Sequence, residues 1–181
     1  MWEVLEHRRV SRQLNRLPQN VLERYEIWKE IVRVSGPQGL RAIRGFNDEA
    51  LRGEWKGHRS SRLNQQYRVL YRIERDEVLV EVVSVKAHNY RRRRNMTEFR
   101  KAKRRVELTV GDSVRIVQEL QELSQNQLAS LTGIPQSTIS AIEHNRVSLG
   151  VERAKVLARA LQVHPSVLVF PGWDVSSESA A

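Results

Sequence analysis

Apolar positions in the first forty residues recur at helical spacing. Three apolar side chains between residues 10 and 17 share one helix face, and a broader apolar stripe runs from residue 22 to residue 32. Pro18 suits the start of that second helix, and the Gly36-Pro37 pair is expected to end it. Ahead of both helices, residues 2–6 are expected to form a short strand.

From residue 54 the apolar period changes to two. In EWKGHRSSRLNQQYRVLYRI (54–73), one set of alternate positions is basic and polar, and the other is mostly apolar. This alternation predicts a strand with cations, a histidine and hydroxyls on one face. QYRVLYRI (66–73) and EVLVEVVSV (77–85) are expected to pair as a hairpin across a turn at Arg75-Asp76. Helices followed by an antiparallel sheet indicate an α+β domain.

After Val110 the helical period returns and continues to about residue 170. Asp112 is expected to cap the first of five helices, and Ser124 with Gln127 forms a capping box at the second. Gly133 predicts a tight turn before the third helix, which Pro135 opens. This part of the chain is therefore predicted to be an all-α domain.

The segment RRRRNMTEFRKAKRR (91–105) separates these two patterns. It has nine Lys/Arg and no apolar periodicity, which is typical of a linker. We expect a first domain at 1–93, a basic linker at 94–106, a helical domain at 107–172 and a disordered tail at 173–181. Met96 lies where a second reading frame would begin, which suggests two genes read as one.

Charge is distributed unevenly over the chain. The 181 residues carry a net charge of +10; residues 1–95 hold 21 Lys/Arg against 12 Asp/Glu, and residues 96–181 hold 10 against 9. A basic first half favours a polyanionic partner such as nucleic acid. The chain has no cysteine, which excludes a disulfide scaffold and thiolate metal sites. With neither a signal peptide nor a membrane-length apolar run, we expect a cytoplasmic protein without membrane contact.

The segment SQNQLASLTGIPQSTISAIEHNR (124–146) has the residues of a DNA reader. Ile139 and Ile142 are expected to face the core, which leaves short polar side chains free at the start of the third helix. Glutamine can bond bidentately to adenine, and serine or threonine to several base edges. The pattern S-Q-x-x-L-A-x-x-x-G-I-x-x-x-x-I-S-x-I-E-x-N-R resembles the helix-turn-helix of the lambda-repressor-like (XRE) family over about residues 108–170.

This resemblance implies operator DNA as a partner and a homodimer that binds two half-sites. The second helix would touch phosphate, the third would read bases, and the turn after it would touch the DNA backbone. The residues expected at DNA are Gln125, Asn126, Gln136, Ser137, Thr138, Ser140, Asn145 and Arg146.

The basic strand of the first half suits phosphate chemistry. RNA can be cut without a metal or cofactor when its own 2′-OH attacks the neighbouring phosphate. That reaction needs a base for the 2′-OH, cations for the phosphorane and an acid for the 5′-oxygen. Histidine titrates near neutral pH, and arginine offers a fixed fork for phosphate oxygens. The groups that could supply this set are Lys56, His58, Arg62, Arg68, His88, Asn89, Tyr90 and Arg91.

GEWKGHRSSRLNQQYRVLYRI and VEVVSVKAHNYR resemble the RelE/ParE toxin superfamily, and within it the HigB and YoeB branches, over about residues 1–93. The resemblance implies two helices packed on a small curled antiparallel sheet, and an endonuclease that cuts mRNA on the ribosome. It implies that Arg68 binds the scissile phosphate, with Lys56 and Arg62 as further phosphate contacts. His88 and Tyr90 would transfer protons and stack on a base.

Two positions depart from these relatives. Asn89 stands where an aspartate is expected in an H-D-Y ending, and Gln66 stands where the YoeB branch has a glutamate base. The base cannot be a carboxylate at either position, so His88 must do more or activity is reduced. The hairpin register also matters, because a slip of one residue would move Arg68 to the face opposite His88.

Other residues with possible chemistry are expected to be structural or solvated. His7 is predicted to lie on the surface. Arg59 and Arg72 are predicted to be solvated, and Trp28 and Trp55 to lie in the core.

Together the two resemblances imply a fused toxin–antitoxin protein in the HigB–HigA gene order. The second half would bind the operator as an autorepressor and neutralise the first half, within one chain or swapped across a dimer. One alternative is a DNA-binding transcription regulator whose inactive toxin half serves dimerisation or sensing, which Asn89 and Gln66 favour. Another is a ParE-like poison of gyrase, against which the H-x-Y ending argues.

Overall fold

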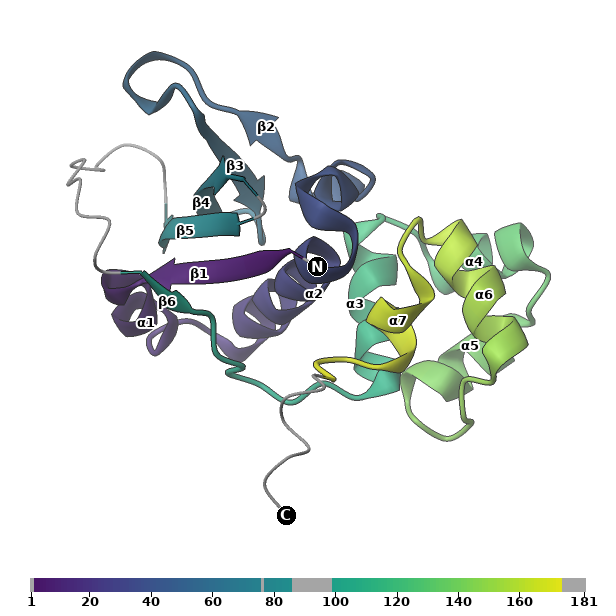
Figure 1. Cartoon of the computed structure of the whole chain (residues 1–181). Helices are drawn as coiled ribbons and strands as arrows, with labels where there is room; N and C mark the ends of the chain where they lie inside the picture. The colour runs from purple at the N-terminus through teal and green to yellow at the C-terminus, as the bar shows by residue number, and fades with distance from the viewer. Residues whose placement is uncertain (1, 76, 86–98, 174–181) are drawn as a thin grey trace.

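The computed structural model describes residues 2–75, 77–85 and 99–173 in three layers. A β-sheet forms the first layer, the long helix α2 (Gln19–Arg41) lies against it, and the helices of the second half pack on the far side of α2 (Figure 1). The predicted combination of an α+β domain and an all-α domain is confirmed. No helix in the described ranges is long and apolar enough to cross a membrane.

The strands found in the described ranges form one sheet in the order β2-β3-β4-β5-β1-β6. Neighbouring strands are antiparallel except β1 and β5, which run parallel with Glu3 opposite Glu77. A parallel pair needs a crossover, and α1 (Arg8–Leu14) and α2 lie between these strands in the chain. The sheet is therefore mixed at this pair. The strands are β1 (Glu3–His7), β2 (Glu49–Ala50), β3 (His58–Arg62), β4 (Tyr67–Glu74), β5 (Glu77–Val85) and β6 (Phe99–Lys101).

The stretch at 54–73 is a hairpin rather than the single strand that its alternation predicts. β3 ends at Arg62 and β4 begins at Tyr67. Asn64 holds the turn, because its side-chain oxygen accepts from the backbone N–H groups of Gln66 and Tyr67, both at 2.8 Å. The alternation survives the turn, because Arg62 pairs with Arg68 and both side chains stay on one face.

Helix α2 buries one side of its predicted stripe against the sheet, on what we call the inner face. Trp28 is fully buried there, stacked on Tyr25 and edge-on to Tyr71 of β4. Gly36 has φ of 69° and interrupts the helix as predicted, but the helix resumes at Pro37 and ends at Arg41. A side chain at Gly36 would collide with the indole of Trp2, whose Nε1 lies 2.6 Å from the Cβ position.

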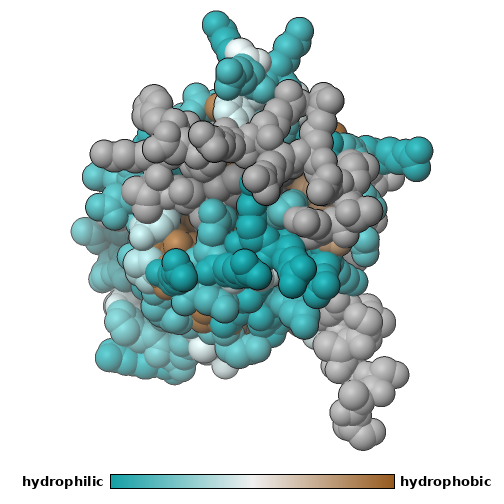
Figure 2. Space-filling model, turned by 90° about the vertical axis from the view of Figure 1, so that its left-hand side faces the viewer, coloured by the Kyte–Doolittle hydropathy of each residue, from teal (hydrophilic) through white to brown (hydrophobic). Residues whose placement is uncertain are grey.

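Part of the predicted linker is ordered structure. Residues 99–105, here called the strap, begin with β6 beside β1 and continue over α2. Buried Lys29 donates to the carbonyl of Lys103 at 2.7 Å, and Arg105 pairs with buried Glu6 at 3.0 Å. Ion pairs and hydrogen bonds to the backbone hold the strap in place. Such contacts do not require apolar residues at regular spacing, so the sequence pattern does not indicate them. On the side of the molecule where β6 lies, the left-hand side of Figure 1, the described atoms are mostly hydrophilic (Figure 2).

The second half is the predicted helical bundle. Thr109, not Asp112, is the N-cap of its first helix, and Asp112 is the third residue of that capping box. The box between Ser124 and Gln127 is confirmed, and Gly133 ends the next helix with φ of 72°. The helices are α3 (Val110–Leu120), α4 (Gln125–Thr132), α5 (Gln136–Glu143), α6 (Val151–Ala160) and α7 (Pro165–Val169).

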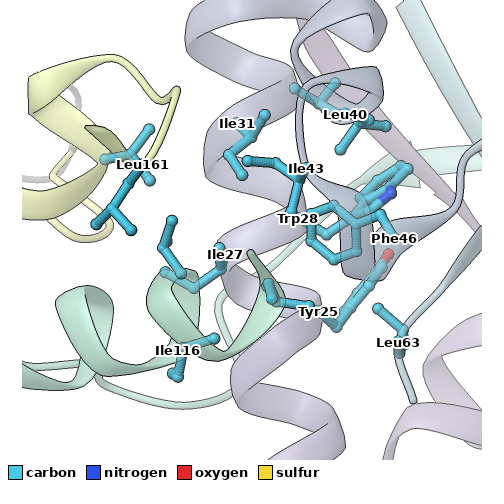
Figure 3. Close-up of a cluster of buried hydrophobic side chains, with 14 of the residues drawn as sticks. Tyr25, Ile27, Trp28, Ile31, Leu40, Ile43, Phe46, Leu63, Ile116 and Leu161 are labelled. Carbon is cyan, nitrogen blue, oxygen red and sulfur yellow. The ribbon is translucent and has the colours of Figure 1, made fainter. Parts of the chain in front are cut away.

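A single hydrophobic core joins the two halves. Ile27 and Ile31 on the far side of α2 lie beside Ile116 of α3 and Leu161 after α6 (Figure 3). Gln121 adds polar contacts, donating to the carbonyls of Ala42 at 3.0 Å and Leu161 at 2.7 Å. We call this contact region the joint. The centre of the joint is apolar, and the polar groups of Gln121 at its edge are hydrogen-bonded. The described parts of the two halves therefore form one packed unit.

Candidate nucleic-acid interfaces

The start of α5 projects from the bundle. Ile139 and Ile142 are buried in the core, as predicted. Gln136 and Ser137 are exposed, and Thr138 and Ser140 are half-buried beside them. The tight turn at Gly133 allows α5 to cross α4 closely. The result is a helix N-terminus with short polar side chains, which fits a major groove.

A chain of side-chain hydrogen bonds fixes Gln136. Its amide donates to Gln125 of α4 at 2.5 Å, and the amide of Gln125 donates in turn to the carboxylate of Glu143. Glu143 is buried, and burial raises the pKa of its carboxyl group. Gln125 therefore contacts the side chain that is predicted to read bases. Sequence reasoning missed Glu143, although it belongs to the helix-turn-helix pattern.

Asn145 is held by the protein itself. With φ of 55°, it accepts from the backbone N–H of Gly111 at 3.1 Å and donates to Thr109 at 2.9 Å. Both contacts tie the turn after α5 to the start of α3, so its side chain is structural here. Arg146 and Asn126 are exposed, as phosphate contacts need to be.

The first half presents a cationic pair on the sheet face turned away from α2, which we call the outer face. Arg62 and Arg68 lie opposite each other on β3 and β4. A guanidinium nitrogen of Arg68 donates to Ser60 at 3.0 Å and to Glu49 of β2 at 2.9 Å. The Arg68 side chain is 22% exposed and that of Glu49 is 51% exposed. This pair can receive a phosphate group, for which Glu49 would have to yield its place on Arg68.

Lys56 and His58 lie toward the other end of β3. His58 lies four positions before Arg62, which is about 13 Å along a strand, and Lys56 lies before the strand begins. His58 is buried, opposite Arg72, and its ring meets Trp55 edge-on at 5.1 Å. The structure therefore brings Arg62 and Arg68 together but does not bring Lys56 and His58 beside them.

A buried carboxylate on the inner face anchors this corner of the sheet. Asp48 accepts from Ser61 and from the hydroxyl of Tyr71, each at 2.7 Å, and pairs with Arg59 at 2.6 Å. Burial, and next the charge of Asp48, raise the pKa of Tyr71 well above its ordinary value. Sequence reasoning missed Asp48 and Glu49, because Asp48 precedes, and Glu49 begins, a strand of two residues that is too short to show a periodic pattern.

The terminal set of predicted site residues cannot be compared with this geometry. His88, Asn89, Tyr90 and Arg91 lie outside the described residues. The register of the β4–β5 hairpin places Arg68 opposite Ser84, with an irregularity between Leu70 and Tyr71. Which face His88 takes stays a prediction.

Three of the residues expected to be surface groups are buried or paired. His7 is buried, its ring meets Phe99 edge-on at 5.3 Å, and it caps α1. Arg59 is bound to Asp48, and Arg72 is paired with Glu74. Trp28 lies in the core as predicted, whereas Trp55 is only half-buried and lies outside the core, so that prediction is wrong. Across the described ranges, His, Asp and Glu side chains do not gather in threes that could hold a metal ion.

Comparison with known families identifies the second half. Residues 115–168 match the family model described as Helix-turn-helix. The match runs from the middle of α3 into α7 and includes the projecting start of α5. The second half is therefore a helix-turn-helix domain, as its sequence pattern predicts. No curated protein sequence matches the chain.

Several solved structures resemble about half of the chain. A YoeB–YefM complex from Staphylococcus aureus is 12% identical with a TM-score of 0.40, covering 48% of this chain and 99% of the other. YafQ from E. coli is 15% identical with a TM-score of 0.36, and the match covers 48% of this chain and 94% of YafQ. A conserved hypothetical protein from Helicobacter pylori is 20% identical with a TM-score of 0.34, covering 47% and 94%. Likenesses this distant assign no activity.

Proposed function

We propose that this protein is a fused toxin–antitoxin protein whose helix-turn-helix half binds operator DNA as an autorepressor. The observation that carries the DNA-binding part is the projecting start of α5 within a helix-turn-helix domain. Gln136 would bond bidentately to an adenine. Its chain of hydrogen bonds through Gln125 to Glu143 supports this role, because a side chain already held in place loses less entropy on binding.

The test of DNA binding is a footprint on the DNA upstream of the protein's own gene, with the full chain. We expect two protected half-sites about 34 Å apart, one helical turn or a multiple of it, as a dimer requires. Protection of no particular sequence would contradict this part of the proposal. A single protected half-site would contradict the dimer and leave DNA binding standing.

The first half, in this proposal, is a ribosome-dependent mRNA endonuclease that uses the RNA's own 2′-OH and no metal. Arg68 binds the scissile phosphate and Arg62 adds a second cation. The cross-strand pairing of these two arginines supports the assignment, because a sheet fixes their spacing better than a loop does. His88 and Tyr90 are proposed as proton-transfer and stacking groups, and Lys56 as a more distant phosphate contact.

The test of RNA cutting maps mRNA 5′-ends in a cell-free translation reaction. The full chain is needed, since a fragment ending at residue 95 would lack the strap and expose the joint. The helix-turn-helix half packs on α2, behind the sheet face that carries Arg68, so in this proposal it leaves the phosphate site open in the intact chain. We expect new 5′-ends with the wild type, and at least about a hundredfold fewer with Arg68→Ala. Arg41→Ala, at the exposed end of α2, is the matched control and should cut normally. Equal cutting by wild type and Arg68→Ala would refute the assigned phosphate site.

A second candidate function follows from the position of the helix-turn-helix half. Its helices pack on α2 and on the turn Arg44–Phe46, behind the sheet face that carries Arg68. A first half built into one core with a DNA reader also suits a transcription regulator whose toxin half is inactive and serves dimerisation or sensing. DNA protection without any mRNA cutting by the wild type would favour this candidate.

A further inference from the structure

A glutamine reads adenine only when its amide group has the right orientation. The inference that follows rests on the proposed DNA-binding function. Adenine presents the N6 donor and the N7 acceptor in the major groove, so the glutamine oxygen must face N6 and a glutamine N–H must face N7. An amide turned end for end has nearly the same shape, so Gln136 alone could take either orientation. The structure contains a group that can set the orientation before DNA is bound.

That group is the carboxylate of Glu143, the last residue of α5. An ionised carboxylate accepts hydrogen bonds and donates none. The Glu143 side chain is buried, and one of its oxygens accepts from the amide of Gln125 at 2.5 Å. The other oxygen is buried without a hydrogen-bond partner among the described residues. Gln125 is therefore the described residue that gives this carboxylate a donor.

The carboxylate fixes the orientation of the Gln125 amide. If that amide turned end for end, its carbonyl oxygen would face the carboxylate, and a buried charge would lose its donor at a cost in free energy. Nε2 of Gln125 is therefore held at Glu143, and Oε1 of Gln125 faces Gln136, whose Nε2 donates to it at 2.5 Å. This leaves Oε1 and one N–H of Gln136 available to a base.

The three side chains form a relay from the core to the surface. Gln125 begins α4, and Gln136 and Glu143 lie at the two ends of α5. Glu143 is buried, Gln125 is half-buried and Gln136 is exposed. Burial strengthens the first hydrogen bond of the relay and keeps water from replacing it. An orientation that is set in the core is thus passed to the side chain that faces solvent.

The carboxylate nearest in role to Glu143 is occupied elsewhere. Glu119 of α3 pairs with Arg24 at 3.0 Å and with Arg115 at 3.2 Å, and its side chain is 41% exposed. Its hydrogen bonds end on arginines, which carry donors only and cannot pass an orientation to an amide. Among the described carboxylates, Glu143 is the one that contacts Gln125.

We propose that Glu143 determines the base preference of the DNA reader by fixing the orientation of Gln136 through Gln125. In this orientation Gln136 accepts from N6 of an adenine and donates to N7. A guanine at the same position would place its O6 acceptor against the oxygen of Gln136 and would be rejected. With the amide turned end for end, its nitrogen would instead donate to the N7 and O6 acceptors of a guanine. Glu143 acts as a positioning residue, because it is buried and reaches the base only through the relay.

The test measures binding of the full chain to four versions of the protected DNA, which differ only at the base pair where Gln136→Ala relaxes the preference. The wild type should prefer adenine over guanine there about 5- to 100-fold, the discrimination of a bidentate contact. Glu143→Gln keeps the size of the side chain but can donate as well as accept, so the relay can form in both orientations. Binding of Glu143→Gln to the adenine version should change less than about threefold, and its preference over guanine should fall below about threefold because binding to the guanine version tightens.

Two further variants at the relay keep the proposal testable if Glu143→Gln does not fold. Gln125→Met interrupts the relay, leaves Gln136 free to turn, and should relax the preference in the same way. Glu143→Asp keeps a group that only accepts, so it should keep the preference for adenine even where its overall affinity is lower. Glu152→Gln is the matched control, since it removes an exposed carboxylate of α6 that pairs with Lys155, and it should bind as the wild type does.

The possible outcomes separate this inference from the proposed function. An unchanged preference in Glu143→Gln and in Gln125→Met would overturn the inference and leave DNA binding standing. Equal losses of affinity for all four DNA versions would show that Glu143 only supports the fold, and would also overturn it. A wild type that binds DNA with no base preference sensitive to Gln136→Ala would overturn the inference together with base reading by Gln136.

Discussion

The two candidate interfaces are built from contacts of very different sequence separation. At the start of α5, the hydrogen bond from Gln136 to Gln125 joins residues 11 apart, and the capping box of α4 joins residues 3 apart. On the sheet, Glu49 and Arg68 are 19 apart, and the strap bond from Arg105 to Glu6 joins residues 99 apart. The DNA reader needs only its own helices, whereas the outer-face site needs the whole sheet.

Because of this difference, the two interfaces are disrupted by different structural changes. A helix N-terminus keeps its polar side chains exposed as long as the helix and its turn form. A cross-strand site is lost when any strand slips by one position, because every side chain then changes face. The two interfaces are not independent in stability, because Ile116 packs against α2 at the joint and links the stability of the two halves. The predictions below test the contrast, from the largest effect to the smallest.

The largest effect is expected for Asp48→Ala, which should lower the free energy of unfolding by about 3–5 kcal/mol. The change leaves the buried end of Arg59 and the hydroxyl of Tyr71 without their acceptor. Urea unfolding followed by far-ultraviolet circular dichroism measures the loss. Glu54→Ala, in the exposed turn Gly53–Trp55, is the control and should stay within about 0.5 kcal/mol of wild type. A loss below 1 kcal/mol for Asp48→Ala would mean that this corner is not held as described.

Ile116→Ala tests the joint and should destabilise the protein by about 2–5 kcal/mol through the cavity it leaves. Because the core is continuous, hydrogen exchange of the α2 amides should speed up together with that of α3. Val151→Ala, at a position 67% exposed, is the control and should leave both unchanged. Faster exchange in α3 with unchanged exchange in α2 would show two halves that unfold independently.

Gln136→Ala should weaken binding to the protected DNA by about 1–3 kcal/mol and relax the preference at one base position. The unfolding free energy should hardly change, since Gln136 is exposed. Titration of labelled DNA measures the affinity, and Gln19→Ala, an exposed glutamine in the first turn of α2, serves as the control. Unchanged affinity for Gln136→Ala would refute its base-reading role.

The smallest effect concerns the cap of α3. Thr109→Ala should cost about 1 kcal/mol. Burial alone would raise the pKa of Asp112, but hydrogen bonds from Thr109 and the charge of Arg115 bring it below its ordinary value of 3.8. The part of this contribution that depends on the ionised carboxylate is therefore fully present above pH 3.8 and is lost as the pH falls through the lowered pKa. The difference in unfolding free energy between wild type and Thr109→Ala should be constant above pH 3.8 and should shrink as the pH falls below it; a difference that does not change with pH would contradict this.

Much of the second half could be predicted because its signals are local. Ser124 with Gln127, the turn at Gly133 and the buried Ile139 lie close together in the chain, and all stand as expected. The sequence points to Asp112 as the N-cap of α3, three residues after the true N-cap Thr109. Both residues belong to the same capping box, and both are types that can cap a helix.

The sequence alone determined which residue types could do chemistry and where periodic elements lie, since helix and strand periods follow from backbone geometry. It determined most of helix α5 and the alternation of the basic strand. Only the tertiary structure decided that the strand turns at Asn64, that the strap belongs to the sheet and that Glu49 meets Arg68. The physical reason is that strand pairing and buried ion pairs join distant residues, and no local pattern encodes which distant partners meet.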